Sequence, residues 1–272
     1  MADSTKRYAV VTGANKGIGF AICKELASKG VVVVLTARDQ KRGLEAIEKL
    51  KDSGSGLPYN VIFHQLDVTD PASIASLQEF VKAQFGKLDI LVNNAGVGGS
   101  IIDAEALRAS GIGKGNVKVD WSKIAIETYE LAEECLEINY YGAKRMYIPS
   151  GWAKEVLSNV HTLAEDKVVE VLKKYLKDFK EGSLEMNGWP VHVSAYTISK
   201  IAMNAYTRIL APKYPSFCVN CVCPGYVKTN INCNTGIMTP EEGARSPVLL
   251  ALLPKGGPSG RFFSLMTESS FE

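Results

Sequence analysis

The turn between the first predicted strand and the first predicted helix constrains the fold of this 272-residue chain more than any other feature. Residues 8–11 form a short apolar run, residues 12–19 contain three glycines, and residues 20–29 carry apolar side chains at helical spacing. Glycines let the backbone approach a pyrophosphate closely, and the helix N-terminus directs amides and a positive dipole toward it. Because this turn follows a strand and opens a helix, we interpret it as a dinucleotide-binding turn rather than a structural loop.

Strand and helix patterns then alternate along the chain. Predicted strands occupy residues 31–36, 60–65 and 88–92, and predicted helices occupy residues 41–51 and 71–85. The strand at 31–36 is almost wholly apolar, as expected for a strand that is covered on both faces. Two further helices are expected over 128–146 and 195–210, and a strand over 217–222. This order predicts an α/β fold with a Rossmann-like, doubly wound parallel sheet, in a single domain spanning residues 1–272.

A block rich in lysine and glutamate, residues 151–190, interrupts this pattern. Thr162 and Glu165 have the spacing of a capping box at a helix N-terminus. The apolar residues that follow share one helical face: Val168, Val171, Leu172, Tyr175 and Phe179. We therefore interpret residues 151–190 as a helical insertion within the domain, ahead of the helix at 195–210.

Charge and composition narrow the partners that the chain can have. The formal net charge is only +2, so we expect no nucleic-acid partner. The longest strongly apolar run, residues 31–35, is too short to cross a bilayer, and the polar first residues lack a signal-peptide core. We therefore expect a soluble, cytoplasmic protein with no membrane partner. On one predicted strand Cys221 and Cys223 share a face and Cys218 takes the other, and no second cluster completes four ligands. We therefore expect buried thiols and no metal site.

The end of the second predicted strand indicates which dinucleotide binds. An NAD site usually offers an acidic residue here for the ribose hydroxyls, whereas this chain offers Arg38, with Lys16 in the glycine turn. Two cations suit the 2′-phosphate of NADP(H), which arginine can hold through two parallel hydrogen bonds. The neighbouring Asp39 leaves two alternatives open, because it could bind the ribose or cap the next helix. We predict NADP(H) as the cofactor.

A tyrosine and a lysine that suit proton transfer lie four residues apart, Tyr196 and Lys200. On a helix this spacing places both side chains on one face. A free phenol has a pKa of about 10, and a nearby positive charge favours the phenolate and lowers that value. Beside a dinucleotide turn, the pair is a candidate for acid–base chemistry near neutral pH.

Together these segments resemble the short-chain dehydrogenase/reductase family. The resemblance covers nearly the whole chain and rests on five ordered motifs: residues 12–19, Leu66-Asp67-Val68, Asn93-Asn94-Ala95-Gly96, Tyr196-x-x-x-Lys200 and Cys223-Pro224-Gly225. Within the family, residues 85–96, 137–146 and 253–260 resemble the plant carbonyl-reductase branch.

The resemblance implies a role for individual residues. Tyr196 would protonate the carbonyl oxygen, Lys200 would hold the nicotinamide ribose and tune Tyr196, and Asn139 would support a proton-relay water. Besides Arg38, Tyr196 and Lys200, the cofactor-binding residues would be Gly13, Asn15, Lys16, Gly17, Ile18, Gly19, Asp67, Val68, Asn94, Ala95, Gly96, Pro224, Gly225, Val227 and Thr229. The insertion would lie over the surface that many relatives use to dimerise, so the resemblance implies a monomer.

One departure from the family pattern affects the chemistry directly. The resemblance implies that, after Met146, the helix continues into a central strand ending in a serine that binds the substrate carbonyl, roughly two dozen residues in all. Here the insertion follows almost at once. Ser150 and Ser194 are weak substitutes, because Pro149 disfavours a central strand and Ser194 is placed to cap a helix. Three explanations stay open: residues missing from this sequence, a deletion around which the fold repacks, or a cofactor-binding protein with impaired chemistry.

The resulting hypotheses differ in catalysis rather than in cofactor. The first is NADPH-dependent, reversible reduction of a hydrophobic ketone or aldehyde, with a terpenoid-like substrate. The second is an NADP(H)-binding protein without turnover, and the third is reduction of an enone C=C bond. Residues 98–121, the insertion and residues 226–239 would line the substrate pocket, with Ile101, Ile102, Ile231, Ile237 and Met238 as its apolar members.

Overall fold

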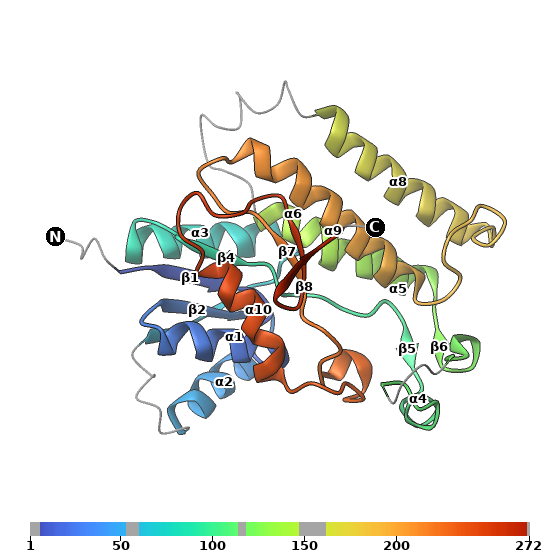
Figure 1. Ribbon diagram of the computed structural model, residues 1–272, viewed down its shortest axis with the longest axis horizontal. Coiled ribbons are helices and arrows are strands. Elements are labelled where there is room, and N and C mark those ends of the chain that lie inside the picture. The colour runs from blue at the N-terminus through green and yellow to red at the C-terminus, as the bar shows by residue number, and fades with distance from the viewer. Residues whose placement is uncertain (1–5, 53–59, 114–117, 147–161, 271–272) are drawn as a thin grey trace.

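A parallel sheet forms the N-terminal half of the fold in the computed structural model, which describes residues 6–52, 60–113, 118–146 and 162–270. Its strands are β1 (Tyr8–Val11), β2 (Val32–Ala37), β3 (Val61–Gln65) and β4 (Ile90–Val92). They lie in the order β3-β2-β1-β4, with all pairs parallel, and Ala9 is in register with Val33 on one side and Ile90 on the other. The predicted Rossmann-like sheet is thereby confirmed (Figure 1).

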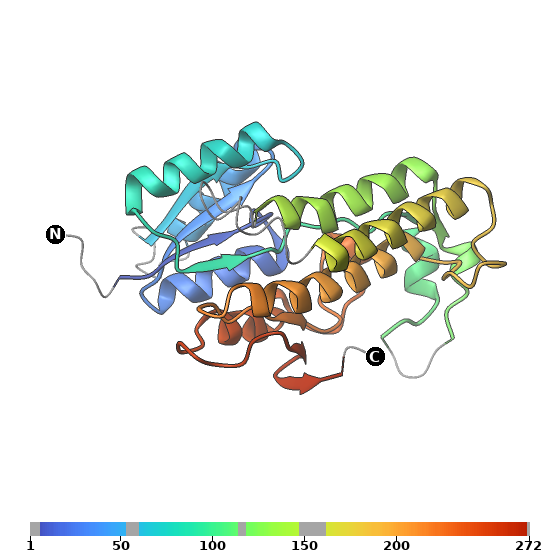
Figure 2. The ribbon, with the colours of Figure 1, turned by 90° about the horizontal axis from the view of Figure 1, so that it is seen from above.

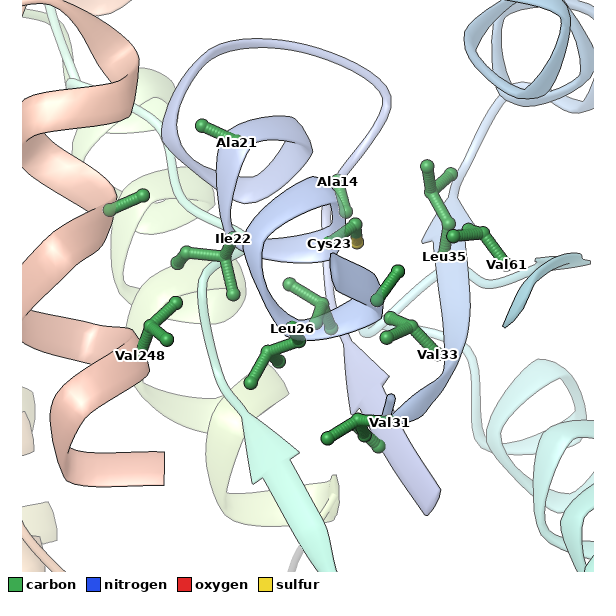
Figure 3. Packing of buried hydrophobic residues seen from close by; sticks show 14 of the residues in the cluster. Ala14, Ala21, Ile22, Cys23, Leu26, Val31, Val33, Leu35, Val61 and Val248 are labelled. Atoms are coloured by element: carbon green, nitrogen blue, oxygen red, sulfur yellow. The ribbon is translucent and has the colours of Figure 1, made fainter. Parts of the chain in front are cut away.

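Helices cover both faces of this sheet. On one face α1 (Gly17–Ser28), α2 (Gln40–Asp52) and α10 (Pro240–Ala251) pack against alternate strand residues such as Val11 and Val33. Figure 3 shows Ile22 and Leu26 of α1 between the strands and Val248 of α10. On the other face α3 (Pro71–Phe85) packs against Val10 and Val34. Every residue of β2 is buried because both of its faces are covered.

Local sequence signals account for the ends of α3, which match the prediction. Pro71 stands in the first turn, where its missing amide hydrogen costs nothing, and the Asp70 side chain accepts a hydrogen bond from the amide of Ala72. Gly86 ends the helix in the left-handed conformation, with φ +72°, that glycine adopts without a steric penalty.

A second core lies between three long helical segments. The helix predicted over 128–146 consists of α5 (Tyr129–Leu136), a π-helical stretch (Glu137–Gly142) and α6 (Ala143–Met146). It packs with α9 (Ser194–Lys213) and with α8 (Thr162–Lys180), the helix of the insertion, as Figure 2 shows. Leu172 and Tyr175 of α8 are buried as predicted, but Val171 is 48% exposed, because α8 presents a narrower face than its pattern indicated.

The sheet is interrupted at the position where the family pattern is broken. Strand β7 (Cys221–Cys223) pairs with β8 (Phe262–Ser264), and β8 with β9 (Thr267–Ser269), in a sheet separate from the first. Among the described strands, β4 has a partner only in β1 and β7 only in β8. The missing strand expected from the sequence is therefore absent from the described residues. Ser150 and Pro149 lie outside them.

The remaining described elements are short. They are a hairpin of β5 (Ile101–Ile102) and β6 (Ala125–Ile126), the helix α4 (Ala104–Ala109), and two 3-10 turns at Trp121–Lys123 and Asn230–Asn232. Within the described part of the chain, no helix combines the length and apolar character needed to span a bilayer.

Candidate cofactor-binding and active site

In the turn between β1 and α1, each glycine avoids a different steric conflict or an unfavourable backbone conformation. Gly13 has φ +61°, and a Cβ there would lie 2.8 Å from Cα of Ala95. A Cβ on Gly19 would lie 2.4 Å from Nδ2 of Asn94. At Gly17, with φ +58°, the nearest atom to a Cβ is Cγ2 of Thr229, at 3.5 Å. The turn therefore packs tightly on Asn94 and Ala95 on one side and reaches Thr229 on another.

Hydrogen bonds fix this turn to the segment after β4. The amides of Asn94 and Ala95 both donate to Oγ1 of Thr12, each at 2.9 Å. Nδ2 of Asn94 donates to the carbonyls of Thr12, at 2.9 Å, and Gly13, at 3.1 Å. Thr12 was not predicted as a site residue, although its place at the end of β1 is a usable signal. The network fixes the turn against the segment after β4.

The start of α1 lacks a capping side chain. Lys16 is the N-cap residue in extended conformation, and its side chain makes no cap hydrogen bond. The amides of the first turn, which includes Gly17, Ile18 and Gly19, therefore retain donor capacity for an anion, and the helix dipole favours one there. This open start, together with the space beside Gly17, fits the pyrophosphate of a dinucleotide.

Lys16 and Arg38, which are predicted to bind the 2′-phosphate, lie in the glycine turn and just after β2. The amide of Ala14 donates to the carbonyl of Thr36 at 2.7 Å, so the turn and the end of β2 are adjacent. Arg38 and Lys16 are both exposed, and no ion pair joins either to another described residue. Asp39 accepts a hydrogen bond from the amide of Arg42 at 2.8 Å. Of the two alternatives for Asp39, the structure therefore supports the helix cap.

Asp67 and Val68 lie in the loop after β3. Oδ1 of Asp67 accepts hydrogen bonds from the amide and hydroxyl of Thr69, at 2.9 and 2.7 Å, and so orders this loop. Val68 is buried against Gly142: a Cβ added to Gly142 would lie 2.7 Å from Cγ2 of Val68. Both residues thus have local packing roles, and their predicted place beside the adenine stays a prediction.

Asn139 lies in the π-helical stretch and joins three elements. Its Oδ1 accepts from the amide of Val97 at 2.8 Å, and its Nδ2 donates to the Val97 carbonyl at 3.0 Å and to Oγ of Ser199 at 2.9 Å. π-Helical turns are frequent at functional sites because they displace a side chain or carbonyl from the regular ladder. Asn139 is buried, and a Cβ on Gly96 would lie 3.1 Å from its Oδ1 and 3.7 Å from Nζ of Lys200.

Tyr196 and Lys200 share a face of α9, as predicted, and Nζ of Lys200 lies 5.2 Å from the centroid of the Tyr196 ring. Burial raises the pKa of Tyr196, and the thiols of Cys223 and Cys135 add to this effect. Although solvent reaches Lys200, the protein around it lowers its pKa by desolvation. Burial thus acts in the direction opposite to the one predicted for Lys200, and the tuning of Tyr196 by Lys200 stays a prediction. A phenol with a raised pKa is protonated near neutral pH, which suits a proton donor.

The segment after β7 reaches the glycine turn. Gly225 has φ +89° and packs on Met238 and Leu265, and Val227 is buried and bridges to Met238. Thr229 carries the side chain that faces Gly17. Cys223, at the end of β7, is exposed, and Cys218 and Cys221 are partly exposed. The expectation of buried thiols was wrong for these three residues, because β7 has an unpaired edge among the described strands.

Ser194 has a structural role in place of the two that the sequence left open. Val193, not Ser194, is the N-cap residue of α9. The Ser194 hydroxyl donates to Oε2 of Glu127 at 2.7 Å and lies 2.7 Å from the hydroxyl of Tyr175. The single hydrogen of the Ser194 hydroxyl is therefore donated to Glu127 and is not available to a carbonyl oxygen. Sequence reasoning missed Glu127, because its partner lies 67 residues away.

A glycine-to-alanine pair tests the close packing of the turn. Gly13→Ala should unfold at a temperature at least about 5 °C below the wild type, since the new Cβ would meet backbone at 2.8 Å. Gly30→Ala is the matched control, because Gly30 also has positive φ, +81°, but nothing within 4 Å of a Cβ. Thermal unfolding of both variants and their affinity for a dinucleotide are the measurements. Equal behaviour of the two variants would show that the contact with Ala95 is unimportant.

Comparison with known proteins agrees with this geometry. Residues 7–114 match the family model described as short chain dehydrogenase. The chain is 54% identical to a (+)-neomenthol dehydrogenase of Arabidopsis thaliana, covering 100% of both chains. It resembles the solved structure of salutaridine reductase from Papaver somniferum, with a TM-score of 0.80 and 48% identity over 95% of this chain and 99% of that one. A more distant relative is carbonyl reductase [NADPH] 1 of Rattus norvegicus, 35% identical over 96% of each chain.

The alignment with the Arabidopsis protein also bears on the interrupted sheet. It runs over 299 positions against the 272 residues of this chain, so at least 27 positions of it have no residue here. This number agrees with the length predicted to be missing after Met146. The ordered motifs, the fold and these relatives establish that the chain belongs to the short-chain dehydrogenase/reductase family of oxidoreductases.

Proposed function

We propose that this protein reduces the carbonyl group of a lipophilic ketone with NADPH, and that Tyr196 donates the proton to the carbonyl oxygen. One chain of contacts carries the proposal. Ala95 packs on Gly13 of the glycine turn, and the next residue, Gly96, lies between Asn139 and Lys200. A cofactor whose phosphates lie at the turn would therefore extend toward Tyr196.

Each part of the site has a task in this reaction. When bound, NADPH supplies the hydride. The turn and the start of α1 hold its pyrophosphate, and Arg38 and Lys16 bind its 2′-phosphate. Lys200 binds the ribose, Asn139 holds the segment at Val97 in place, and the protonated phenol of Tyr196 neutralises the charge that develops on the carbonyl oxygen. The name of the rat relative also includes NADPH.

The apolar surface near the site supports a lipophilic substrate. Ile101 and Ile126 are cross-strand neighbours, 58% and 63% exposed. The two loops predicted to line the pocket meet, since a Cβ on Gly98 would lie 3.5 Å from Ile231 and one on Gly113 would lie 3.0 Å from Ile237. The names of the plant relatives refer to a terpenoid alcohol and an alkaloid. We propose a ketone of terpenoid-like character, acted on by a monomer, with α8 covering α5 and α9.

Turnover assays with product analysis test the proposal. NADPH oxidation should accompany reduction of menthone to a menthol, and neomenthol with NADP+ should run the reaction backward. With a cyclic enone, mass spectrometry separates the allylic alcohol from the saturated ketone, and the latter would identify an alkene reductase. NADPH binding without turnover on any of these compounds would contradict the proposal.

The interrupted sheet favours a second candidate, an NADP(H)-binding protein with impaired catalysis. The strand that would carry the carbonyl-binding serine is absent from the described residues, and Ser194 is engaged by Glu127. This candidate predicts an NADPH dissociation constant in the range of its relatives with no measurable turnover. The same assays decide between the two candidates.

Removing the cation at the end of β2 should change the preference between cofactors. Arg38→Ala is expected to weaken NADPH binding by about 10- to 100-fold, since a charge-assisted hydrogen bond contributes about 1.5–3 kcal/mol. NADH binding should change little, because NADH lacks the 2′-phosphate. Fluorescence titration measures both constants, with Arg42→Ala as the control on the neighbouring helix. Equal loss for both cofactors would remove Arg38 from the 2′-phosphate site.

A further inference from the structure

The first turn of α9, which carries Tyr196, has no side-chain cap from the residue that precedes the helix. Val193 precedes the helix with φ 51° and ψ 32°, a left-handed conformation that a β-branched residue rarely adopts, and it makes no side-chain cap. Its carbonyl accepts from the amide of Thr197 at 3.1 Å and from the Thr197 hydroxyl at 3.0 Å. The amides of Ser194 and Ala195 therefore depend on an acceptor from elsewhere in the chain.

Glu127 is that acceptor. Its Oε2 receives the amide of Ser194 at 2.9 Å, the hydroxyl of Ser194 at 2.7 Å and, more weakly, the amide of Ala195 at 3.5 Å. A carboxylate at this place also meets the positive end of the α9 dipole. The next residue along the helix is Tyr196.

The insertion helix contributes to the same network. Because the Ser194 hydroxyl gives its hydrogen to the carboxylate, the hydroxyl of Tyr175 must be the donor in its 2.7 Å contact with Ser194. Burial raises the pKa of Tyr175, which keeps it in the donor form. Tyr175 and Ser194 are both 0% exposed, so water does not replace either partner.

The same glutamate adjoins the second helix of the site. Thr128, the next residue, is the N-cap of α5, and its hydroxyl accepts from the amide of Leu131 at 3.3 Å. The helical run that begins there leads to Asn139, whose Nδ2 donates to Ser199 of α9. The starts of the two helices that carry Tyr196 and Asn139 are thus joined at Glu127, and the helices meet again at Asn139 and Ser199.

We infer that Glu127 is a positioning residue, which fixes the first turn of α9 and the Tyr196 hydroxyl relative to the cofactor and substrate, with Tyr175 of the insertion helix as its support. The inference rests on the proposed reductase function. It gives the insertion a part in catalysis through the chain Tyr175, Ser194, Glu127. Misplacement of a reacting group by about 1 Å can lower the rate about 100-fold.

Two isosteric substitutions with matched controls test this inference. Glu127→Gln removes the charge and keeps the volume, and Tyr175→Phe removes only the donor. The controls are Glu134→Gln, an exposed glutamate on α5, and Tyr129→Phe, whose hydroxyl bonds Glu133 at the surface. We expect kcat for ketone reduction to fall about 10- to 100-fold in Glu127→Gln and about 3- to 10-fold in Tyr175→Phe. The ketone KM and the NADPH dissociation constant should stay within about 3-fold of the wild type, and the controls should keep full kcat.

Each outcome decides the question. An unchanged kcat in Glu127→Gln overturns the inference, and so does a parallel loss of kcat, NADPH affinity and thermal stability, which is the mark of general unfolding. If the wild type itself lacks turnover, the proposed function fails, and hydrogen exchange then decides the inference. Faster exchange at the amides of Ser194 and Ala195 in Glu127→Gln, with unchanged exchange over residues 202–210, supports the positioning role of Glu127. Unchanged exchange at those two amides overturns it.

Discussion

Tyr196→Phe is expected to lower kcat for ketone reduction by at least about 100-fold, the usual contribution of a positioned general acid. The substitution removes the hydroxyl and keeps the ring, so the contact with Lys200 at 5.2 Å and the packing of α9 should survive. The NADPH dissociation constant should therefore change little. Steady-state kinetics and fluorescence titration on the same preparation measure both quantities.

The direction of the Tyr196 pKa makes this prediction specific to reduction. Burial raises that pKa, so the phenol is protonated over the whole neutral range and donates without prior titration. Alcohol oxidation needs the opposite form, and we expect it to speed up as pH rises toward that raised pKa. Tyr129→Phe, which removes a surface hydroxyl, is the control. Undiminished turnover in Tyr196→Phe would identify another proton source.

Adding the missing strand is expected to produce the largest gain in thermal stability and in kcat. The strand segment of the Arabidopsis relative, whose alignment has at least 27 positions without a residue in this chain, would be placed after Met146, where the family pattern predicts the loss. The added residues would offer β4 and β7 the second partner that each lacks among the described strands. Each buried backbone group without a partner costs about 1–3 kcal/mol, so pairing two edges should raise the unfolding temperature by about 10 °C or more. Thermal unfolding and kcat are the measurements.

Adding the strand also separates the two candidate functions. If the serine of the restored strand binds the carbonyl, kcat should rise at least about 10-fold, whereas a glycine-serine segment of equal length should change neither kcat nor stability. Three buried polar atoms lack partners among the described residues, namely Oδ1 of Asn93, the hydroxyl of Tyr140 and Nη1 of Arg145. Asn93 follows β4 and Arg145 lies in α6, next to the gap. An unchanged unfolding temperature would mean that the sheet is already complete without the strand.

Sequence alone determined the features that depend on residues close together in the chain. The glycine turn, the bounds of α3, and the Tyr196/Lys200 spacing on α9 were all predicted, because glycine conformations and helical periodicity involve neighbours within a turn or two. The break after Met146 was also predicted from the sequence, by comparison with the family pattern. The parallel sheet followed from the alternation of strands and helices.

Tertiary structure alone decided which distant groups meet. Asp39 accepts a hydrogen bond from the amide of Arg42 in α2, Cys223 is exposed, and Val171 is 48% exposed. Glu127 meets Ser194 across 67 residues, and no local pattern marks that contact. The direction of the Tyr196 pKa was also out of reach, because it depends on how much water the packed helices exclude. Short-range patterns set the elements, whereas burial and long-range hydrogen bonds arise only when those elements pack, and they give this site its chemistry.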